Sequence, residues 1–311
     1  MLVWSESGLW KKNMSWIPRN TSEWARGIKI ENPGAFSPLL VRIANRVLWP
    51  LVRMLFRPQL KGVENLPRDR PYLLVANHSA GAGIAEIMCI IALYLRHVGP
   101  TKPLAGFALP QMFRVYPLSR LMKSVGAIPS TYDAAQRALK ENVPILVFPG
   151  GNHETLRPVW KANQVDFCGR TGFLKIAREA GVPIIPLGIR GAHYTCPIFV
   201  RSKLLSWLLL VPRVLSLKRW AISLTGVFGA TAILALTPLN LEWRILLTWL
   251  WLGSPIVFIP IIPWNIRLRI GQPLEPHDLF EDQSEHALHR ALQHVQSEVE
   301  ALIAVGNASG K

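Results

Sequence analysis

The fold is decided by Tyr72-Leu-Leu-Val-Ala-Asn77-His78-Ser79-Ala80-Gly81-Ala82-Gly83-Ile84-Ala85-Glu86. An apolar run that ends in polar and glycine residues predicts a short buried strand, followed by a glycine-rich turn into a helix. His78 is therefore expected at the carboxyl end of that strand. Ligands bind at this edge of the sheet in α/β proteins, so the imidazole could face a substrate. A solvated or core-packed histidine is the alternative, and the rest of the chain must decide between them.

Strand-like and helix-like segments alternate beyond this stretch. We expect helices at 84–95, 134–141, 172–181 and 285–303, and strands at 104–109, 144–148, 182–188 and 265–270, the last as an edge strand. This alternation predicts an α/β fold with a mainly parallel central sheet flanked by helices. Four domains are predicted. Residues 1–57 form an N-terminal basic, Trp-rich segment with an amphipathic helix, and residues 58–202 form an α/β core. Residues 203–266 form a hydrophobic membrane-associated helical insertion, and residues 267–311 form a C-terminal strand and helix that complete the core.

The amino-acid composition of the chain indicates whether it binds nucleic acid or a membrane surface. The chain has 311 residues, a net charge of +16, twelve tryptophans and 50% hydrophobic residues. Nucleic-acid binders rarely combine so much positive charge with so much apolar sequence, whereas basic residues among Trp and Leu suit an anionic membrane surface. Three widely spaced cysteines without a Cys-x-x-Cys pair predict unpaired thiols in a reducing compartment and no zinc site.

The N-terminal segment is expected to lie on a surface. Residues 1–37 contain no continuous apolar run or small-residue cleavage site, so we expect no secretory signal. Residues 39–57 have helical apolar spacing but four arginines, which argues against a membrane-spanning helix and favours an in-plane amphipathic one. Pro50 must kink or divide that helix. The alternative is a helix packed on the protein's own core.

Two uncharged runs dominate the region 203–266. Residues 220–241 and 245–266 each hold 22 residues without a charge. Each run is long enough to cross a bilayer core of about 30 Å, although internal glycines and prolines also fit a re-entrant or interfacial hairpin. Basic residues flank the pair on both sides, which predicts entry and exit on the cytoplasmic side. The alternative is a buried hydrophobic subdomain that encloses an acyl chain.

Four sequence blocks stand in order along the chain. They are Asn77-His78 with Glu86, Gly126-Ala127-Ile128-Pro129, Phe148-Pro149-Gly150-Gly151-Asn152-His153-Glu154, and Val182-Pro183-Ile184-Ile185-Pro186. Together, over about residues 60 to 192, they resemble the glycerolipid acyltransferase superfamily, which contains the lysophosphatidic acid acyltransferases. The third block looks more like the diacylglycerol acyltransferase-like branch.

The resemblance implies an enzyme of lipid and phospholipid biosynthesis, and the apolar runs with their basic flanks predict a membrane location with the active site facing the cytoplasm. It would move a fatty acyl group from acyl-CoA or an acyl carrier protein to a hydroxyl of a glycerolipid or similar lipid. No further cofactor and no metal are implied. A lipid ester or thioester hydrolase, or an inactive membrane-binding module, remains the alternative function.

Attack of a hydroxyl on a thioester needs a base, and imidazole titrates near the working pH, so His78 is the predicted base. A carboxylate must fix its tautomer and stabilise the imidazolium. The family has an Asp five residues after the His, where this chain has Gly83. Glu86 would lie about 12 Å away in a continuous helix, but a glycine-rich loop can fold it back. We favour Glu86, with Glu154 as the competing partner.

The remaining site residues carry weaker expectations. Backbone N–H groups around Gly150 and Gly151 could hold the developing oxyanion, or form only a tight turn. The predicted substrate-binding residues are Asn77, Ser79, Gly126, Ile128, Pro149, Gly150, Gly151 and Asn152. No Gly-x-Ser-x-Gly elbow is present, so direct transfer is expected.

Family members that act on phosphorylated acceptors usually carry arginines in the second and third blocks, because a guanidinium fork clasps phosphate. Here the comparable positions are Ser130-Thr131-Tyr132 and Asn152-His153, and the nearest arginine is Arg157. The sequence therefore does not predict a phosphate-bearing acceptor.

Overall fold

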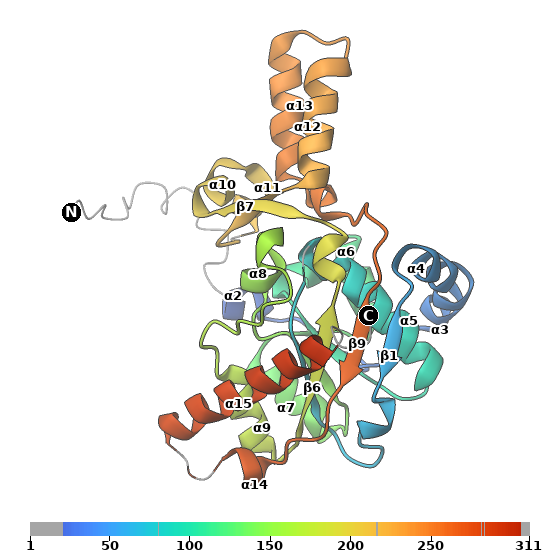
Figure 1. Ribbon diagram of the computed structural model, residues 1–311, viewed down its shortest axis with the longest axis vertical. Helices are drawn as coiled ribbons and strands as arrows, with labels where there is room; N and C mark the ends of the chain where they lie inside the picture. Colours follow the sequence, from blue (N-terminus) through green and yellow to red (C-terminus); the bar gives the residue numbers. More distant parts are fainter. Residues whose placement is uncertain (1–20, 80, 216, 281, 283, 306–311) are drawn as a thin grey trace, which may run out of the picture.

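The structure, a computed structural model, describes residues 21–305 apart from 80, 216, 281 and 283; the N-terminal tryptophans Trp4, Trp10 and Trp16 lie outside this part. A seven-stranded sheet in the order β1-β9-β6-β2-β5-β3-β4 forms its centre (Figure 1). The strands are β1 (Gln59–Lys61), β2 (Leu73–Ala76), β3 (Ala105–Ala108), β4 (Ile128–Pro129), β5 (Ile145–Val147), β6 (Ile184–Arg190) and β9 (Arg267–Ile270). Every neighbouring pair is parallel except β6 with β9. The predicted α/β fold with a mainly parallel sheet is confirmed.

Strand β9 corrects one prediction. Leu268 pairs with Leu60 of β1 on one side and with Ile189 of β6 on the other, so β9 is an inner strand. The alternation of polar and apolar residues in β9 reflects one buried face and one partly covered face, which a strand can have at any place in the sheet.

Helices cover both faces of the sheet. One face carries α7 (Tyr132–Lys140), α9 (Gly172–Ala180) and α15 (Glu285–Ala304), which pack on inward side chains such as Val75 and Ile184. The other carries α4 (Trp49–Phe56) and α5 (Ile84–His97), packed on the alternate residues of the same strands. This alternation matches the two-residue period of a strand buried on both faces.

The N-terminal helix is divided as Pro50 predicts. Helix α3 (Pro38–Ile43) continues through the π-helical turn η1 (Ala44–Leu48) into α4, where Pro50 lies in the first turn. One side of this helix packs on the core through Val52 and Phe56. The opposite side exposes a row of apolar side chains at helical spacing: Leu39, Ile43, Val47, Leu51 and Met54. Both faces that the sequence suggested are present on the same helix.

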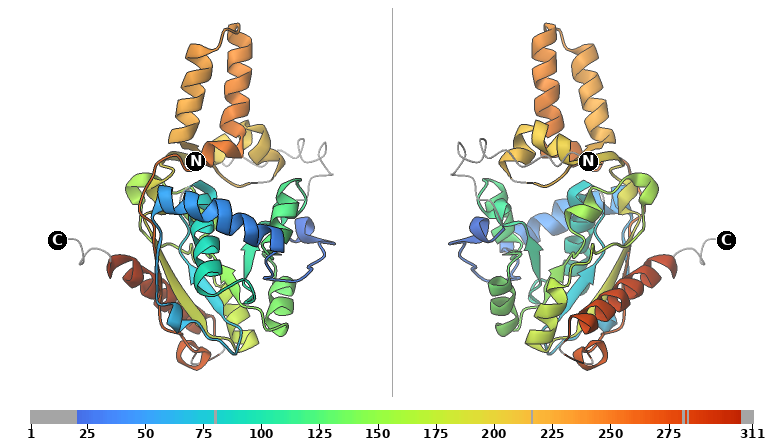
Figure 2. Two further views of the ribbon diagram at one scale, coloured as in Figure 1. Left: turned by 90° about the vertical axis from the view of Figure 1, so that its right-hand side faces the viewer. Right: turned by 90° about the vertical axis from the view of Figure 1, so that its left-hand side faces the viewer.

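The uncharged runs fold as a projecting hairpin (Figures 1 and 2). Strands β7 (Ile198–Ser202) and β8 (Trp220–Ser223) form an antiparallel ribbon at its root, followed by α12 (Leu224–Leu236), α13 (Leu241–Gly253) and the short turn η7 (Pro255–Phe258). Each helix has 13 residues, or about 20 Å against about 30 Å for a bilayer core. None of the described helices is both long and apolar enough to cross a membrane.

The hairpin is not a closed hydrophobic subdomain. Only its root is buried, in a small cluster that includes Trp220, Val257 and Phe258. Farther out, large apolar side chains are exposed, for example 61% for Phe228 and 80% for Leu236. The alternative of an acyl-enclosing subdomain is wrong for the described residues, because beyond the root α12 and α13 leave their outer faces uncovered.

Candidate active site

The strand that ends at His78 is fixed to its neighbour by Asn77. The Asn77 side-chain amide donates to the Ile189 carbonyl at 2.8 Å and accepts from the Ile189 N–H at 2.7 Å. Asn77 is fully buried. Its predicted role in substrate binding is therefore wrong: this side chain extends the pairing of β2 with β6 beyond the strand and holds the next residue, His78, in place.

Glu86 folds back onto His78. Its Oε1 atom contacts Nδ1 of His78, and its side chain is fully buried, whereas that of His78 is 13% exposed. The His78 ring also stacks on Phe148, with centroids 4.2 Å apart. A carboxylate at Nδ1 keeps the proton there, so Nε2 is the nitrogen that can accept a proton from a substrate.

The surroundings of Gly83 explain why this chain has no aspartate at that position. This residue has φ +75°, and a Cβ atom there would lie 2.3 Å from Cε1 of His78 and 3.0 Å from Oε1 of Glu86. The space that an Asp side chain would need is filled by the dyad itself. Glu86, in the first turn of α5, is the carboxylate that contacts the His78 ring instead.

Replacing Gly83 by alanine is expected to lower kcat by about a hundredfold or more, the usual contribution of a positioned base, because the new methyl group displaces the His78 ring. The matched control is Gly99→Ala. Gly99 also has a positive φ (+98°), but nothing lies within 4 Å of its would-be Cβ. Equal activity in the two variants, at comparable melting temperatures, would show that the crowding at Gly83 has no role in placing the base.

Glu154 binds the backbone of His78 and not its ring. One carboxylate oxygen accepts from the His78 N–H at 2.9 Å and the other from the Asp166 N–H at 2.9 Å. A Cβ at Gly150 would lie 2.1 Å from this carboxylate, so only glycine fits there. Burial raises the pKa of Glu154 to about 7. The alternative in which Glu154 is the ring partner is wrong, and its contacts give it the role of fixing the His78 loop.

Several predicted binding residues are structural. The Gly151 N–H donates to the Phe148 carbonyl at 3.1 Å, as the tight-turn alternative requires, and the oxyanion role of the N–H groups around Gly150 and Gly151 stays a prediction. Gly126 packs against the backbone of Gly34 and Ala35. Ile128 is a fully buried core residue of β4. These positions are needed for close packing, which explains their residue types without a substrate.

The other predicted binding residues lie around the same loops. Ser79 is fully buried, and its hydroxyl has no hydrogen-bond partner among the described residues. The Pro149 carbonyl accepts a hydrogen bond from Arg170 at 2.7 Å. Asn152 begins α8 (Asn152–Thr155). None of these contacts assigns the three residues a role toward substrate.

A polar cluster that the sequence did not predict lies beside the third block. His153 Nε2 lies 2.7 Å from Asp166, Nδ1 lies 3.0 Å from Arg219, and the His153 carbonyl accepts from Arg201. Burial lowers the pKa of His153. Cys168 is close enough to share a metal ion with His153 and Asp166, but the two guanidinium groups oppose a cation there. Arg201 lies in β7 and Arg219 directly precedes β8, so no local sequence motif predicts that they approach His153.

A protein-family model described as Acyltransferase matches residues 57–190. This segment of the chain is similar to the acyltransferase family. The match covers all four sequence blocks and confirms the resemblance drawn from them. The His78–Glu86 contact lies inside the matched segment.

Comparisons with whole proteins find relatives of low sequence identity and one solved structure with the same fold. An uncharacterized protein of Mycobacterium tuberculosis is 27% identical over 203 residues, 64% of this chain and 54% of the relative. Phytyl ester synthase 2, chloroplastic, of Arabidopsis thaliana is 25% identical over 150 residues, 46% of this chain and 21% of that protein. The chain thus spans about half the length of the mycobacterial relative. The crystal structure of the 1-acyl-sn-glycerophosphate (LPA) acyltransferase PlsC from Thermotoga maritima shares the fold, with a TM-score of 0.50, 17% identity, and coverage of 98% of this chain and 90% of that chain.

Proposed function

We propose that the protein is a membrane-associated O-acyltransferase that moves a fatty acyl group from an acyl thioester to a lipid hydroxyl. The contact between His78 and the buried Glu86, inside an acyltransferase domain, is the observation that carries this proposal. The donor is acyl-CoA or an acylated carrier protein, and the acceptor is a glycerolipid or a similar lipid alcohol.

In the proposed mechanism, Nε2 of His78 removes the hydroxyl proton as the acceptor oxygen attacks the thioester carbonyl. Glu86 stabilises the imidazolium that forms. The new C–O bond replaces the C–S bond, and the imidazolium returns its proton to the leaving thiolate. The products are the lipid ester and the free thiol of the donor. The test is acceptor-dependent formation of a lipid ester by the purified protein.

Membrane attachment is proposed through the hairpin. Its exposed apolar side chains and length of about 20 Å suit insertion into one leaflet. The exposed apolar row of α3, η1 and α4, flanked by arginines, suits an in-plane contact with anionic lipids. Basic residues on both sides of 220–266 support a cytoplasmic active site, where a water-soluble donor can reach His78.

The hairpin is expected to retain the protein on vesicles through high salt and alkaline wash, because its apolar contact is not screened by ions, whereas electrostatic attraction decays within about 8 Å at physiological ionic strength. Changing Phe228, Leu236 and Leu247 to glutamine should convert the protein to a salt-released form. The same number of changes in α3, η1 and α4, at Leu39, Val47 and Met54, is the matched comparison and should weaken binding less.

A cysteine at Trp243, near the hairpin tip, should be hidden from an impermeant thiol reagent on membranes. The exposed Cys168 must first be changed to serine, because it would react as well. Full labelling at position 243, together with release by salt alone, would refute membrane insertion of the hairpin.

A further inference from the structure

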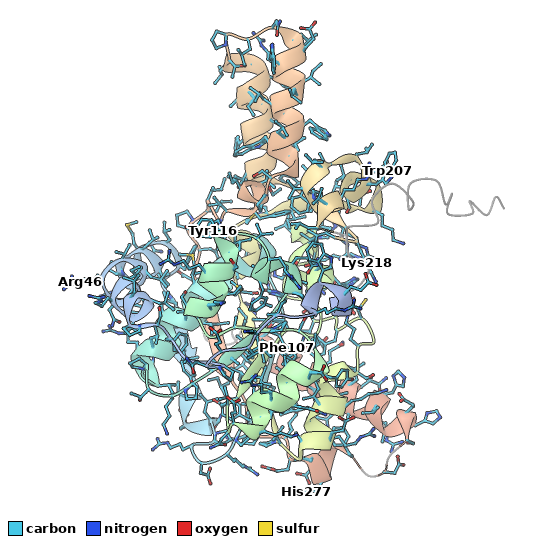
Figure 3. All side chains as sticks on the ribbon, turned by 180° about the vertical axis from the view of Figure 1, so that it is seen from behind. Arg46, Phe107, Tyr116, Trp207, Lys218 and His277 are labelled. Carbon is cyan, nitrogen blue, oxygen red and sulfur yellow. The ribbon has the colours of Figure 1, made fainter. Side chains whose placement is uncertain are left out.

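A buried arginine follows the third block. Figure 3 shows Arg46 and Lys218 at the surface of the molecule, where basic side chains are usually found. Arg157, in contrast, is only 3% exposed. A cationic side chain at this depth loses its hydration, and it is tolerated where opposite charge and hydrogen bonds replace the lost water. The contacts of Arg157 therefore indicate the role of its side chain.

The guanidinium group of Arg157 contacts two other positions of the chain. Its Nη1 atom donates to the Gln164 carbonyl, and its Nη2 atom lies 3.5 Å from Oε1 of Glu154. Among the described residues Nη2 has no hydrogen-bond partner, so its contact with Glu154 is an ion pair. One arm of the planar fork thus holds the loop before Asp166 and the other faces the buried carboxylate, an arrangement that the single ammonium group of lysine does not reproduce.

The carboxylate of Glu154 connects this ion pair to the predicted base. Its Oε2 atom accepts from the His78 N–H and its Oε1 atom accepts from the Asp166 N–H, both at 2.9 Å. Both oxygens therefore act as acceptors. The ionised carboxylate serves both N–H groups, whereas protonation turns one oxygen into a hydroxyl donor. Loss of the ionised form would weaken the hold of Glu154 on the backbone of His78.

The groups around Glu154 set the balance between its two forms. Burial raises the pKa of Glu154 to about 7. The N–H groups of Asp166 and His78 act to lower this pKa, as do the charges of Arg157 and His78. His193, just after β6, also lies near, but burial lowers its pKa to about 3, with Arg157 and His78 as further causes, so it is neutral at the working pH. The positive charge beside Oε1 is that of Arg157.

We propose that Arg157 is a positioning residue, which favours the ionised form of Glu154 and thereby fixes the backbone of His78 in the geometry that proton removal requires. The inference rests on the proposed function, in which His78 is the base. Arg157 is the arginine nearest to the third block in the sequence, but its burial and its contacts direct it to Glu154 and not to the surface.

The first test follows the His78 amide by NMR in protein with isotopically labelled histidine, its signal being assigned by its loss in His78→Gln. In the wild type this signal should titrate near pH 7 as Glu154 ionises. Glu154→Gln identifies the part of the titration that belongs to Glu154, because protonation of the His78 ring remains in that variant. Arg157→Gln and Arg157→Met should each raise the midpoint of this part by about one pH unit, as expected when an opposite charge is removed.

Two further variants show whether the charge beside Glu154 causes the shift. Arg157→Lys keeps the charge and should move the midpoint less. Arg170→Met is the matched control, because Arg170 also donates to a backbone carbonyl of the third block, that of Pro149 at 2.7 Å, and its loss should leave the midpoint unchanged. If one of the two neutral variants at position 157 fails to fold, the other decides. An unchanged midpoint in a folded neutral variant would overturn the role of Arg157, whether or not the protein is an acyltransferase.

Kinetics then connect the titration with catalysis. As pH rises through the Glu154 midpoint, kcat should increase, because the ionised carboxylate holds the His78 loop. In Arg157→Gln, kcat at pH 7 should fall by about three- to fivefold and recover about one pH unit higher, with the KM values unchanged. Adding Arg157→Gln to Glu154→Gln should cause no further shift of the pH profile.

The pattern of losses separates positioning from a merely structural role. A loss of kcat in Arg157→Gln that is equal at every pH, or a shift that persists in the Glu154→Gln background, would overturn the proposal. Absence of acyl transfer by the wild type at every pH, together with the expected shift of the His78 amide midpoint, would refute the proposed function and leave the link from Arg157 through Glu154 to His78 in place.

Discussion

Replacement of His78 by alanine or glutamine is expected to lower acyl transfer by about a hundredfold or more, because the acceptor hydroxyl then has no positioned base. The two variants differ in stability. Alanine leaves the buried Glu86 carboxylate without its partner, which is costly, whereas the glutamine amide can donate to it. Initial rates on vesicles, with melting temperatures measured in parallel, provide the check.

Folding and membrane attachment of His78→Gln serve as the control for that loss. Both should equal the wild type, since His78 contributes to neither the sheet nor the hairpin. Turnover of His78→Gln near the wild-type rate would remove His78 from the mechanism and leave the chain as a binding module or an enzyme with another base.

Changing Glu86 to glutamine is expected to reduce kcat by about a hundredfold or more while the fold is retained. The amide oxygen can still accept the Nδ1 proton of His78, so the tautomer is preserved. A neutral amide cannot stabilise the imidazolium that forms during transfer, so the loss falls on kcat and not on KM. Steady-state kinetics of the variant with a saturating acyl donor separate the two parameters.

The Glu154→Gln variant gives the informative comparison. Glu154 accepts two backbone N–H groups, from His78 and Asp166, and an amide has only one acceptor oxygen. We expect a loss of stability of about 1–3 kcal/mol for the lost buried hydrogen bond, and a smaller effect on kcat than in Glu86→Gln. If only the Glu154 change damages kcat at equal stability, the dyad assignment is wrong.

The sequence predicted those parts of the fold that depend on local pattern. Buried strands such as Leu73–Ala76 and Ile184–Arg190, and the amphipathic helix Glu285–Ala304, are visible as apolar runs or helical periodicity. The place of a strand in the sheet is set by pairing between distant segments. The alternation in Arg267–Ile270 therefore could not reveal that β1, only three residues long, covers its outer side.

The uncharged runs show a similar limit of local pattern. Two stretches of 22 uncharged residues predicted apolar helices, but their first and last parts are used in β8 and in the turn η7. Ser223 ends β8 and caps α12 by accepting from the Gly226 N–H at 3.0 Å. Hydropathy alone cannot predict such a cap, because the cap depends on the geometry of one side chain.

In the candidate site, the sequence predicted the contact between His78 and Glu86, because a chemical requirement restricted the choice of partner. A base needs a carboxylate, and the glycines at 81 and 83 made Glu86 reachable by a loop. Backbone packing was misread as binding at Asn77, Gly126 and Ile128, since both uses favour the same residue types. The arginines 201 and 219 were recognised only as flanking charges, because their approach to His153 depends on how the β7–β8 ribbon folds over the third block.

The central claim is tested most directly by following an isotopically labelled acyl thioester in the presence of the purified protein and lipid vesicles, with and without a lipid alcohol. The labelled acyl group should appear in a lipid ester only when the acceptor is present, with one free thiol released per ester formed, and the reaction should be lost in His78→Gln. Release of free labelled fatty acid at the same rate without any acceptor would contradict the account and identify a hydrolase.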